Sequence, residues 1–277
     1  MTAKDIWGSF GEPGRDGAPR EWDARAYHVL SEPQFEWGRR VLDDLELSGS
    51  ERALDAGCGS GRLTSLLATR LPSGSVVGLD RSENMARAAR DTLATHGDRC
   101  EVVVADLRAV PFSNAFDVVF STATFHWVLD HDALFAALHR ILRPGGVLHA
   151  QCGGSGNLAR AHERAEAVMT SRTFAAFFRE WKSPWEFADA ATTAARLERA
   201  GFSGVRTGLE QAFVELPDAR TFRAFVSVVV LRPHLARLPT EELREQFVDD
   251  VTKLAAREEP AFLLDYWRLN LHGVKAR

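Results

Sequence analysis

The chain has 277 residues, of which 45% are hydrophobic and 26% are charged, the ordinary balance of a globular protein with a sizeable core. Its 34 Lys and Arg against 38 Asp and Glu give a formal net charge of -4, which argues against nucleic-acid or membrane binding through a basic surface. Cys58, Cys100 and Cys152 form no CxxC pair and adjoin no histidine cluster. The sequence therefore predicts neither a disulfide scaffold nor a metal site.

The first 20 residues contain four glycines and two prolines. We predict a mobile tail over residues 1–20, followed by one domain over 21–277. No apolar signal core opens the chain, and no apolar run approaches the roughly 20 residues that a membrane span requires. We therefore expect a cytoplasmic protein without a membrane partner.

From about residue 52, short apolar runs alternate with segments of helical periodicity. Ser82 is the expected N-cap of a helix that reaches about Thr95, and Asp132 is the expected N-cap of a later helix. Alternating strands and helices indicate parallel strands joined by crossover helices. Ligands of such doubly wound α/β sheets bind beyond the carboxyl ends of the strands. The five expected strands span 52–55, 75–79, 102–104, 116–120 and 147–150.

The second half of the chain adds helices and two more strands. Residues 157–200 and 218–258 have a mostly helical pattern, and residues 205–216 and 264–274 have a strand pattern. We predict a mostly parallel seven-stranded sheet with helical insertions after its fifth and sixth strands. These insertions, at about 157–188 and 218–258, are expected to form a cap over the site.

A glycine-rich loop, Asp55-Ala56-Gly57-Cys58-Gly59-Ser60-Gly61, follows the first expected strand. A dinucleotide fingerprint would need a small residue at position 62, where Arg62 stands. The acid two residues before the first glycine suits a ligand that has an amino-acid end and no phosphates. An ordinary strand-to-helix turn is the alternative, but three further strand ends also carry suitable residues.

The loop from Leu54 to Gly61 resembles the first motif of class I S-adenosylmethionine (SAM)-dependent methyltransferases, which have a Rossmann-like fold. The resemblance extends from about Trp22 to Ala150 and implies SAM as cofactor and S-adenosylhomocysteine as product. It also implies that Asp80 accepts hydrogen bonds from both ribose hydroxyls, as an acceptor-only carboxylate can, and that Asp106 receives the adenine amino group. The other cofactor positions that it implies are Trp22, Tyr27, Asp55, Gly57, Cys58, Gly59, Gly61, Arg81, Met85, Ala105, Leu107 and Ser121.

Several of these residues also have structural interpretations. A methionine on a helix, such as Met85, is often simply part of a core. The structural alternative for Asp80 is a helix cap, although Ser82 is the better candidate for that cap. Trp22 and Tyr27 either close the N-terminal segment over the cofactor or anchor it through hydrophobic contacts.

Within the class, the chain is most similar to the trans-aconitate methyltransferase-like small-acid O-methyltransferases. The similar segments are 22–27, 125–131 and 231–233, although His126 stands where Gln is expected and the tail before Trp22 is longer. The resemblance implies that the Trp127 indole donates to a substrate carboxylate. We expect His126 to donate to the same oxygen, or to act as a general base if the nucleophile is a hydroxyl, and Arg232 to pair with a second carboxylate. The alternatives are that Trp127 forms a wall of the pocket, that His126 has a structural role and that Arg232 faces solvent.

We expect methyl transfer from SAM to a small molecule, with a carboxylate oxygen as acceptor because it is ionised without a general base. The alternatives are a hydroxyl, amine or carbon of a secondary metabolite, or a SAM-binding protein without catalysis. A nucleic-acid acceptor is not favoured, since the segment Phe120-Ser121-Thr122-Ala123 stands where amino methyltransferases of nucleic acids carry an Asn-Pro-Pro-Tyr-like motif. The oligomeric state, monomer or dimer, stays open.

Overall fold

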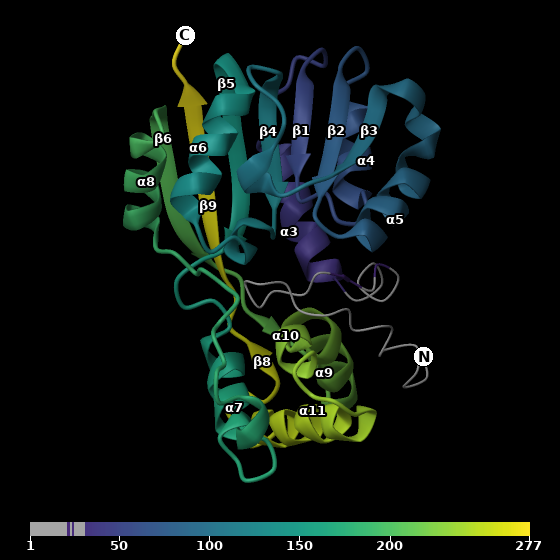
Figure 1. Cartoon of the computed structure of the whole chain (residues 1–277), viewed down its shortest axis with the longest axis vertical. Coiled ribbons are helices and arrows are strands. Elements are labelled where there is room, and N and C mark those ends of the chain that lie inside the picture. Colours follow the sequence, from purple (N-terminus) through teal and green to yellow (C-terminus); the bar gives the residue numbers. More distant parts are fainter. Residues whose placement is uncertain (1–20, 23, 25–30) are drawn as a thin grey trace. The chain divides into compact units, whose positions relative to one another are not determined.

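The computed structural model describes residues 21, 22, 24 and 31–277 and divides into two compact units (Figure 1). The sheet unit comprises residues 32–155, 186–210 and 268–277. The helical unit comprises the described residues up to 31 together with 156–185 and 211–267. The predicted tail lies outside the described residues. The two predicted cap segments belong to the helical unit except for residues 186–188, and their covering of a site stays a prediction.

A seven-stranded sheet forms the centre of the sheet unit, with the strand order β3-β2-β1-β4-β5-β9-β6. Strands β1 to β5 pair in parallel, and β9 pairs with β5 in the antiparallel direction. The predicted doubly wound, mostly parallel sheet is therefore confirmed. The strands are β1 (Arg52–Ala56), β2 (Ser75–Asp80), β3 (Cys100–Val104), β4 (Phe116–Thr122), β5 (Leu142–Gly153), β6 (Phe202–Gln211) and β9 (Trp267–Lys275).

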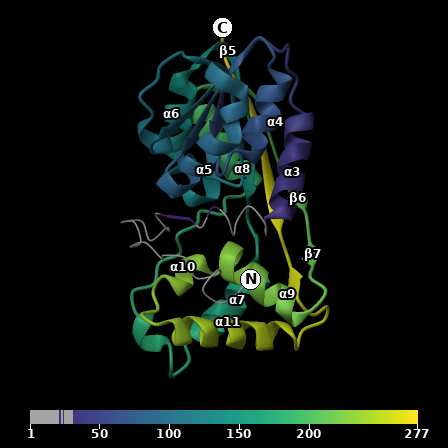
Figure 2. The same ribbon diagram turned by 90° about the vertical axis from the view of Figure 1, so that its right-hand side faces the viewer.

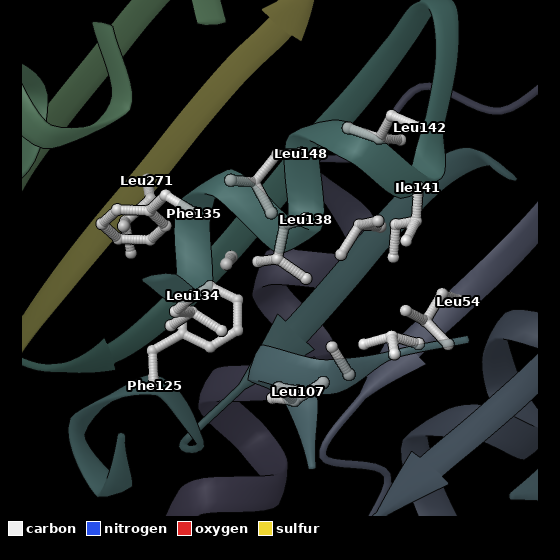
Figure 3. Packing of buried hydrophobic residues seen from close by; sticks show 14 of the residues in the cluster. Leu54, Leu107, Phe125, Leu134, Phe135, Leu138, Ile141, Leu142, Leu148 and Leu271 are labelled. Atoms are coloured by element: carbon white, nitrogen blue, oxygen red, sulfur yellow. The ribbon is translucent and has the colours of Figure 1, made fainter. Parts of the chain in front are cut away.

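Helices cover both faces of this sheet because its central strands are apolar on both faces. In β1, Ala53 joins a core with residues of α3 and α4, whereas Leu54 joins a core with residues of α6 and α8. Figure 2 shows the sheet with α3 and α4 on one side and α6 on the other, and Figure 3 shows the second core. The helices of this unit are α3 (Glu32–Asp43), α4 (Arg62–Arg70), α5 (Glu83–Leu93), α6 (His131–Ile141) and α8 (Ala190–Arg199), with 3-10 turns η1 (Ala94–Arg99), η2 (Leu107–Ala109) and η3 (Phe125–Trp127).

The structure confirms one predicted helix cap and corrects the other. The Ser82 hydroxyl accepts a hydrogen bond from the Met85 N–H at 3.2 Å, and α5 begins at Glu83, directly after Ser82. The N-cap of α6 is Asp130, whose carboxylate accepts from the Ala133 N–H at 2.9 Å. The prediction of Asp132 was wrong because that residue already lies in the first turn, where its carboxylate pairs with Arg199 at 2.7 Å.

The predicted strand at 205–216 is divided between the two units. Its first part is in β6, whereas β7 (Val214–Glu215) pairs with β8 (Leu263–Leu264) in the helical unit. Residues 178–189 form no helix in the described chain, although they lie inside the stretch predicted as mostly helical. The remaining helices are α7 (Ala159–Met169), α9 (Ala219–Phe225), α10 (Arg232–Leu235) and α11 (Glu241–Ala255), with the short turns η4 (Ala175–Phe177) and η5 (Val226–Val230).

Ion pairs and aromatic packing hold the helical unit together. Arg160 and Arg164 on α7 both bind Glu258, which follows α11, at 2.5 Å. Phe174 packs edge-on against Phe247 of α11 with ring centroids 5.2 Å apart. No helix in the described part of the chain has the length and apolar character needed to cross a membrane.

Candidate functional site

The strand order reverses between β1 and β4, and the loops that follow these two strands are in contact. Thr124, after β4, donates from its hydroxyl to the Gly57 carbonyl at 3.3 Å. Gly57 has φ +89°, and a Cβ at this position would lie 2.1 Å from Thr124 Oγ1. Only glycine fits here. The predicted loop therefore lies at the switch point, where ligands of doubly wound sheets bind.

Asp80, at the end of β2, fixes the middle of the glycine loop. Its Oδ2 accepts from the Gly59 N–H at 2.9 Å, and its Oδ1 accepts from the Ser82 N–H at 2.9 Å. Each carboxylate oxygen has a second lone pair, so two further donors such as ribose hydroxyls fit this group. A Cβ at Gly59 would meet no atom of the described residues within 4 Å, so the loop is open on that side of Gly59.

Asp55, at the end of β1, is buried and accepts a hydrogen bond from the Thr64 hydroxyl at 2.7 Å. Burial raises the pKa of the Asp55 carboxyl to about 7, and the nearby charge of Asp80 acts in the same direction. A cationic group beside Asp55 would favour its ionised form. The sequence did not identify Thr64, because no local motif marks its hydrogen bond to Asp55.

The backbone of the glycine loop is tied to β2 as well. The N–H groups of Gly57 and Cys58 both donate to the Leu79 carbonyl, at 2.7 and 2.9 Å. The Cys58 side chain is buried, so this residue contributes its backbone to the loop. Gly61, with φ +84°, is the residue before α4, and a Cβ there would lie 3.1 Å from the Cα of Ala89 on α5.

Asp106 follows β3 as predicted, and its carboxylate is engaged by a neighbour. Arg108 donates to it from its backbone N–H at 2.9 Å and from its guanidinium at 2.6 and 3.0 Å. These bonds hold the pKa of the Asp106 carboxyl below its usual range. An adenine amino group would share this carboxylate with Arg108, a contact that the sequence did not reveal.

The other predicted residues around this end of the sheet occupy different environments. Met85 and Leu107 are buried, whereas Arg81 and Ala105 are half-buried. Ser121 is buried and donates from its hydroxyl to the Ala56 carbonyl at 2.6 Å. Ser121 therefore ties the end of β4 to the start of the glycine loop.

His126 and Trp127 lie in η3, directly beyond β4, and their ring centroids are 5.4 Å apart. The His126 Nδ1 accepts a hydrogen bond from the Gly153 N–H at 3.2 Å. A backbone N–H can only donate, so the neutral ring must carry its proton on Nε2. Burial and the positive charge of Arg268 hold the pKa of His126 well below its usual range. His126 is thus a neutral hydrogen-bond donor.

Arg232 and Trp22 belong to the helical unit. The buried Arg232 guanidinium donates to the Glu21 carbonyl at 3.0 and 3.3 Å and lies 5.8 Å from the centroid of the Trp22 ring. Their expected contacts with substrate and cofactor stay predictions. Tyr27 lies outside the described residues. Over 21, 22, 24 and 31–277, no three His, Cys, Asp or Glu side chains converge to hold a metal ion.

Comparisons with known proteins agree with this geometry. Residues 53–146 match the family described as "Methyltransferase domain". A trans-aconitate 2-methyltransferase of Azoarcus sp. is 38% identical over 130 residues, which cover 47% of this chain and 50% of that protein. This match therefore spans about half the length of that relative. A malonyl-(acyl-carrier protein) O-methyltransferase of Geobacter sulfurreducens is 33% identical over 210 residues, which cover 72% of this chain and 73% of that protein.

A solved structure shows the same fold. The phosphoethanolamine N-methyltransferase 2 of Haemonchus contortus, in complex with phosphomonomethylethanolamine and S-adenosylhomocysteine, superposes with a TM-score of 0.61 at 18% identity, covering 100% of this chain and 61% of that one. The sheet order, the glycine loop at the switch point and the acid that ends β2 fit SAM as cofactor. The chain belongs to the class I SAM-dependent methyltransferases.

Proposed function

We propose that the protein transfers a methyl group from SAM to a carboxylate oxygen of a small molecule and so forms a methyl ester. The observation that carries this proposal is the state of His126. Its Nδ1 is occupied by the Gly153 N–H, and its ring is neutral with the proton on Nε2. A residue in this state orients an acceptor but takes no proton from it. A carboxylate is the acceptor that needs no base, because it is ionised at neutral pH.

The cofactor would lie against the glycine loop. Asp80 would accept from the two ribose hydroxyls, and Asp55 would balance the positive charge of the methionine end. Bound SAM supplies an electrophilic methyl group on a positively charged sulfur. Asp55 and Asp80 both lie at carboxyl ends of strands that flank the loop, which supports their acting on one ligand.

The acceptor would lie beside η3. We expect the Nε2–H of His126 and the indole N–H of Trp127 to hold the reacting carboxylate about 3 Å from the methyl carbon, the distance that an in-line displacement needs. Neutral donors suit this task, because they orient an anionic nucleophile without neutralising it. The names of two relatives support an acid as acceptor: one is a trans-aconitate 2-methyltransferase, and the other is a malonyl-(acyl-carrier protein) O-methyltransferase.

Arg232 would pair with a second carboxylate of the acceptor, and Trp22 and Tyr27 would close over the cofactor. We propose a cytoplasmic enzyme whose partner is a small molecule and which binds neither nucleic acid nor a membrane.

The test is methyl transfer from radiolabelled SAM to a panel of small acids, phenols and amines that includes trans-aconitate. Mild base releases label from an ester and leaves an ether or an amine intact. Base-labile label on an acid is the expected result. Base-stable label would replace the carboxylate with a hydroxyl, amine or carbon acceptor. SAM binding without transfer to any compound would favour the non-catalytic alternative.

A further inference from the structure

The η3 turn is bound by groups from two later segments of the chain. The Phe125 carbonyl lies 3.1 Å from the Nε2 of His131, the first residue of α6. The His126 carbonyl accepts a hydrogen bond from the Glu186 N–H at 2.9 Å. Phe187, the next residue, stacks on the His126 ring with centroids 5.7 Å apart. The orientation of η3 therefore depends on where His131 and the segment from Glu186 are held.

One arginine of α8 holds both of these partners. The Arg196 Nη1 donates to the Glu186 Oε1 at 2.9 Å and lies 3.2 Å from the His131 Nδ1. A guanidinium Nη carries two N–H bonds and can only donate, so this one nitrogen serves both acceptors. Only 19% of the Arg196 side chain is exposed, which strengthens bonds made by its charge. All of these residues belong to the sheet unit.

The contact with Arg196 determines the tautomer of His131. Burial lowers the pKa of His131, and the positive charge of Arg196 acts in the same direction, so the ring is neutral at pH 7.5. Because Arg196 can only donate, the His131 Nδ1 is the acceptor and the ring proton lies on Nε2. The Nε2–H then donates to the Phe125 carbonyl. A chain of hydrogen bonds thus runs from Arg196 through His131 to η3.

A second arginine on α8 makes an ion pair of a different kind. Arg199 binds Asp132 of α6 at 2.7 Å, and the two side chains are 59% and 60% exposed. Asp132 also lies 3.9 Å from the Arg196 Nε. The Arg199 pair joins the same two helices at the surface, where such pairs contribute little to stability. Arg199 is therefore a matched comparison for Arg196.

We propose that Arg196 is a positioning residue for the acceptor, because it fixes the orientation of η3 through Glu186 and His131. This inference rests on the proposed function, which assigns the donors of His126 and Trp127 in η3 to the reacting carboxylate. A misplacement of about 1 Å at a reacting group can lower a rate by about 100-fold. The role of Arg196 thus concerns the use of the acceptor and not the binding of SAM.

Amide hydrogen exchange tests this positioning without any acceptor. Arg196→Met keeps an apolar side chain and removes the guanidinium. In the protein loaded with S-adenosylhomocysteine, this variant should speed exchange about tenfold at the amides of Glu186 and Gly153, which bind the carbonyl and the Nδ1 of His126. Arg199→Met should change neither rate. Unchanged exchange at both amides in Arg196→Met would overturn the proposal.

Steady-state rates give the second readout. With an accepted acid, Arg196→Met should lower kcat/KM by about tenfold, the usual effect of losing one hydrogen-bonded charge partner. Its affinity for S-adenosylhomocysteine, measured by calorimetry, should stay within about twofold of wild type. An equal loss of cofactor affinity would mean that Arg196 supports the whole unit, and faster exchange with an unchanged kcat/KM would mean that η3 does not hold the acceptor. Either result would overturn the proposal.

Two substitutions of His131 separate hydrogen bonding from packing. Gln offers an N–H to the Phe125 carbonyl and an oxygen to Arg196, whereas Leu offers neither. His131→Gln should keep kcat/KM within about threefold of wild type, and His131→Leu should lose about tenfold. Equal losses would contradict the hydrogen-bonded chain. If Arg196→Met fails to fold, Glu186→Gln, at a carboxylate that is 34% exposed, must show the same selective loss.

The proposed function can fail independently of this inference. If the wild type methylates a hydroxyl or an amine, the carboxylate reaction is wrong, and the same comparison of kcat/KM with that acceptor decides the role of Arg196. If the wild type transfers to no compound, the exchange rates of Glu186 and Gly153 still decide whether Arg196 fixes η3.

Discussion

Asp55, the proposed counter-charge for the methionine end of SAM, has an unfavourable effect on stability. Its carboxyl is buried, and its pKa is raised from 3.8 to about 7. The folded protein therefore holds this proton at a pH where the unfolded chain has released it. As the pH rises from about 4 to 7, this difference lowers the stability of the folded state. Above pH 7 the whole cost of burying the charge is present.

We predict that Asp55→Asn stabilises the free protein and weakens its binding of SAM. The melting temperature should rise by several degrees at pH 7.5, and the gain should disappear toward pH 4, where the wild-type carboxyl is neutral. SAM affinity should fall by at least tenfold because the methionine end loses its counter-charge. Thermal melts across this pH range and calorimetry would measure both effects. Asp91→Asn, on the exposed face of α5, is the matched control; a variant that is less stable at pH 7.5 would contradict the argument.

The tautomer of His126 leads to a second prediction. His126→Gln keeps an N–H near the position of Nε2 but removes any base, so transfer to a carboxylate should stay within about tenfold of wild type. His126→Phe removes the donor and should lose about 10- to 100-fold in kcat/KM. Steady-state rates with an accepted acid from pH 6 to 8 would test this. A loss of 100-fold or more in the Gln variant, with a rate that follows a base, would show general-base catalysis.

How far the site can be predicted depends on the distance along the chain between its parts. The glycine loop and Asp80 lie within 26 residues of each other, and positive φ angles make glycine necessary, so a local motif identifies them. The Arg196–His131 bond joins residues 65 positions apart. Nothing in either segment indicates such a contact, because it depends on the packing of α8 against α6. Thr64 is only nine positions from Asp55, but no local motif marks the hydrogen bond between them.

At the scale of elements, the period of apolar residues predicted the five parallel strands and the helices that connect them. Errors arose where two signals overlap. Asp130 and Asp132 both precede the same apolar run, and only the geometry of the first turn shows that Asp130 is the cap. The strand pattern over 205–216 continues from β6 into β7, although these strands belong to different sheets. Alternation specifies an extended chain but not its partner strand.

The junction between the β1 and β4 loops gives a prediction about two elements together. Gly57→Ala should lower the free energy of unfolding by about 2–4 kcal/mol and weaken SAM binding, because it combines a strained φ with a clash against Thr124. Gly59→Ala is the matched control. It has φ +54° but no atom within 4 Å of the added Cβ, so it should cost only about 1 kcal/mol. Urea unfolding would measure both. Thr124→Ala, which shortens the clashing side chain, should restore part of the loss; equal losses in the two glycine variants would contradict this account.

At the scale of the whole molecule, both units carry buried histidines whose pKa values are lowered, and the sheet unit also carries buried acids whose pKa values are raised. In the sheet unit, burial raises the pKa values of Asp55 and Asp80, whose protonation favours the folded state, and lowers the pKa values of His126 and His131, which has the opposite effect on stability in acid. The helical unit contains His162 and His234, whose pKa values burial lowers to about 4 and about 3. The unfolded chain takes up protons at these histidines below about pH 6.5, whereas the folded unit does not. This difference lowers the stability of the helical unit as the pH falls from about 6.5 toward 3.

His234 provides the test of this difference, since it stacks on Trp181 at 4.5 Å and on Phe247 at 5.9 Å. We predict that His234→Phe, which keeps an aromatic ring and removes the ionisable group, raises the free energy of unfolding more at pH 5 than at pH 7.5. Hydrogen exchange should show the added protection at pH 5 in α7, α10 and α11, and not in the strands of the sheet unit. His96→Phe, at a half-buried histidine in the 3-10 turn η1 of the sheet unit, should leave that protection unchanged. An equal gain at both pH values would mean that His234 affects stability through packing alone, because a proton-linked cost must grow as the pH falls below the pKa of the unfolded histidine.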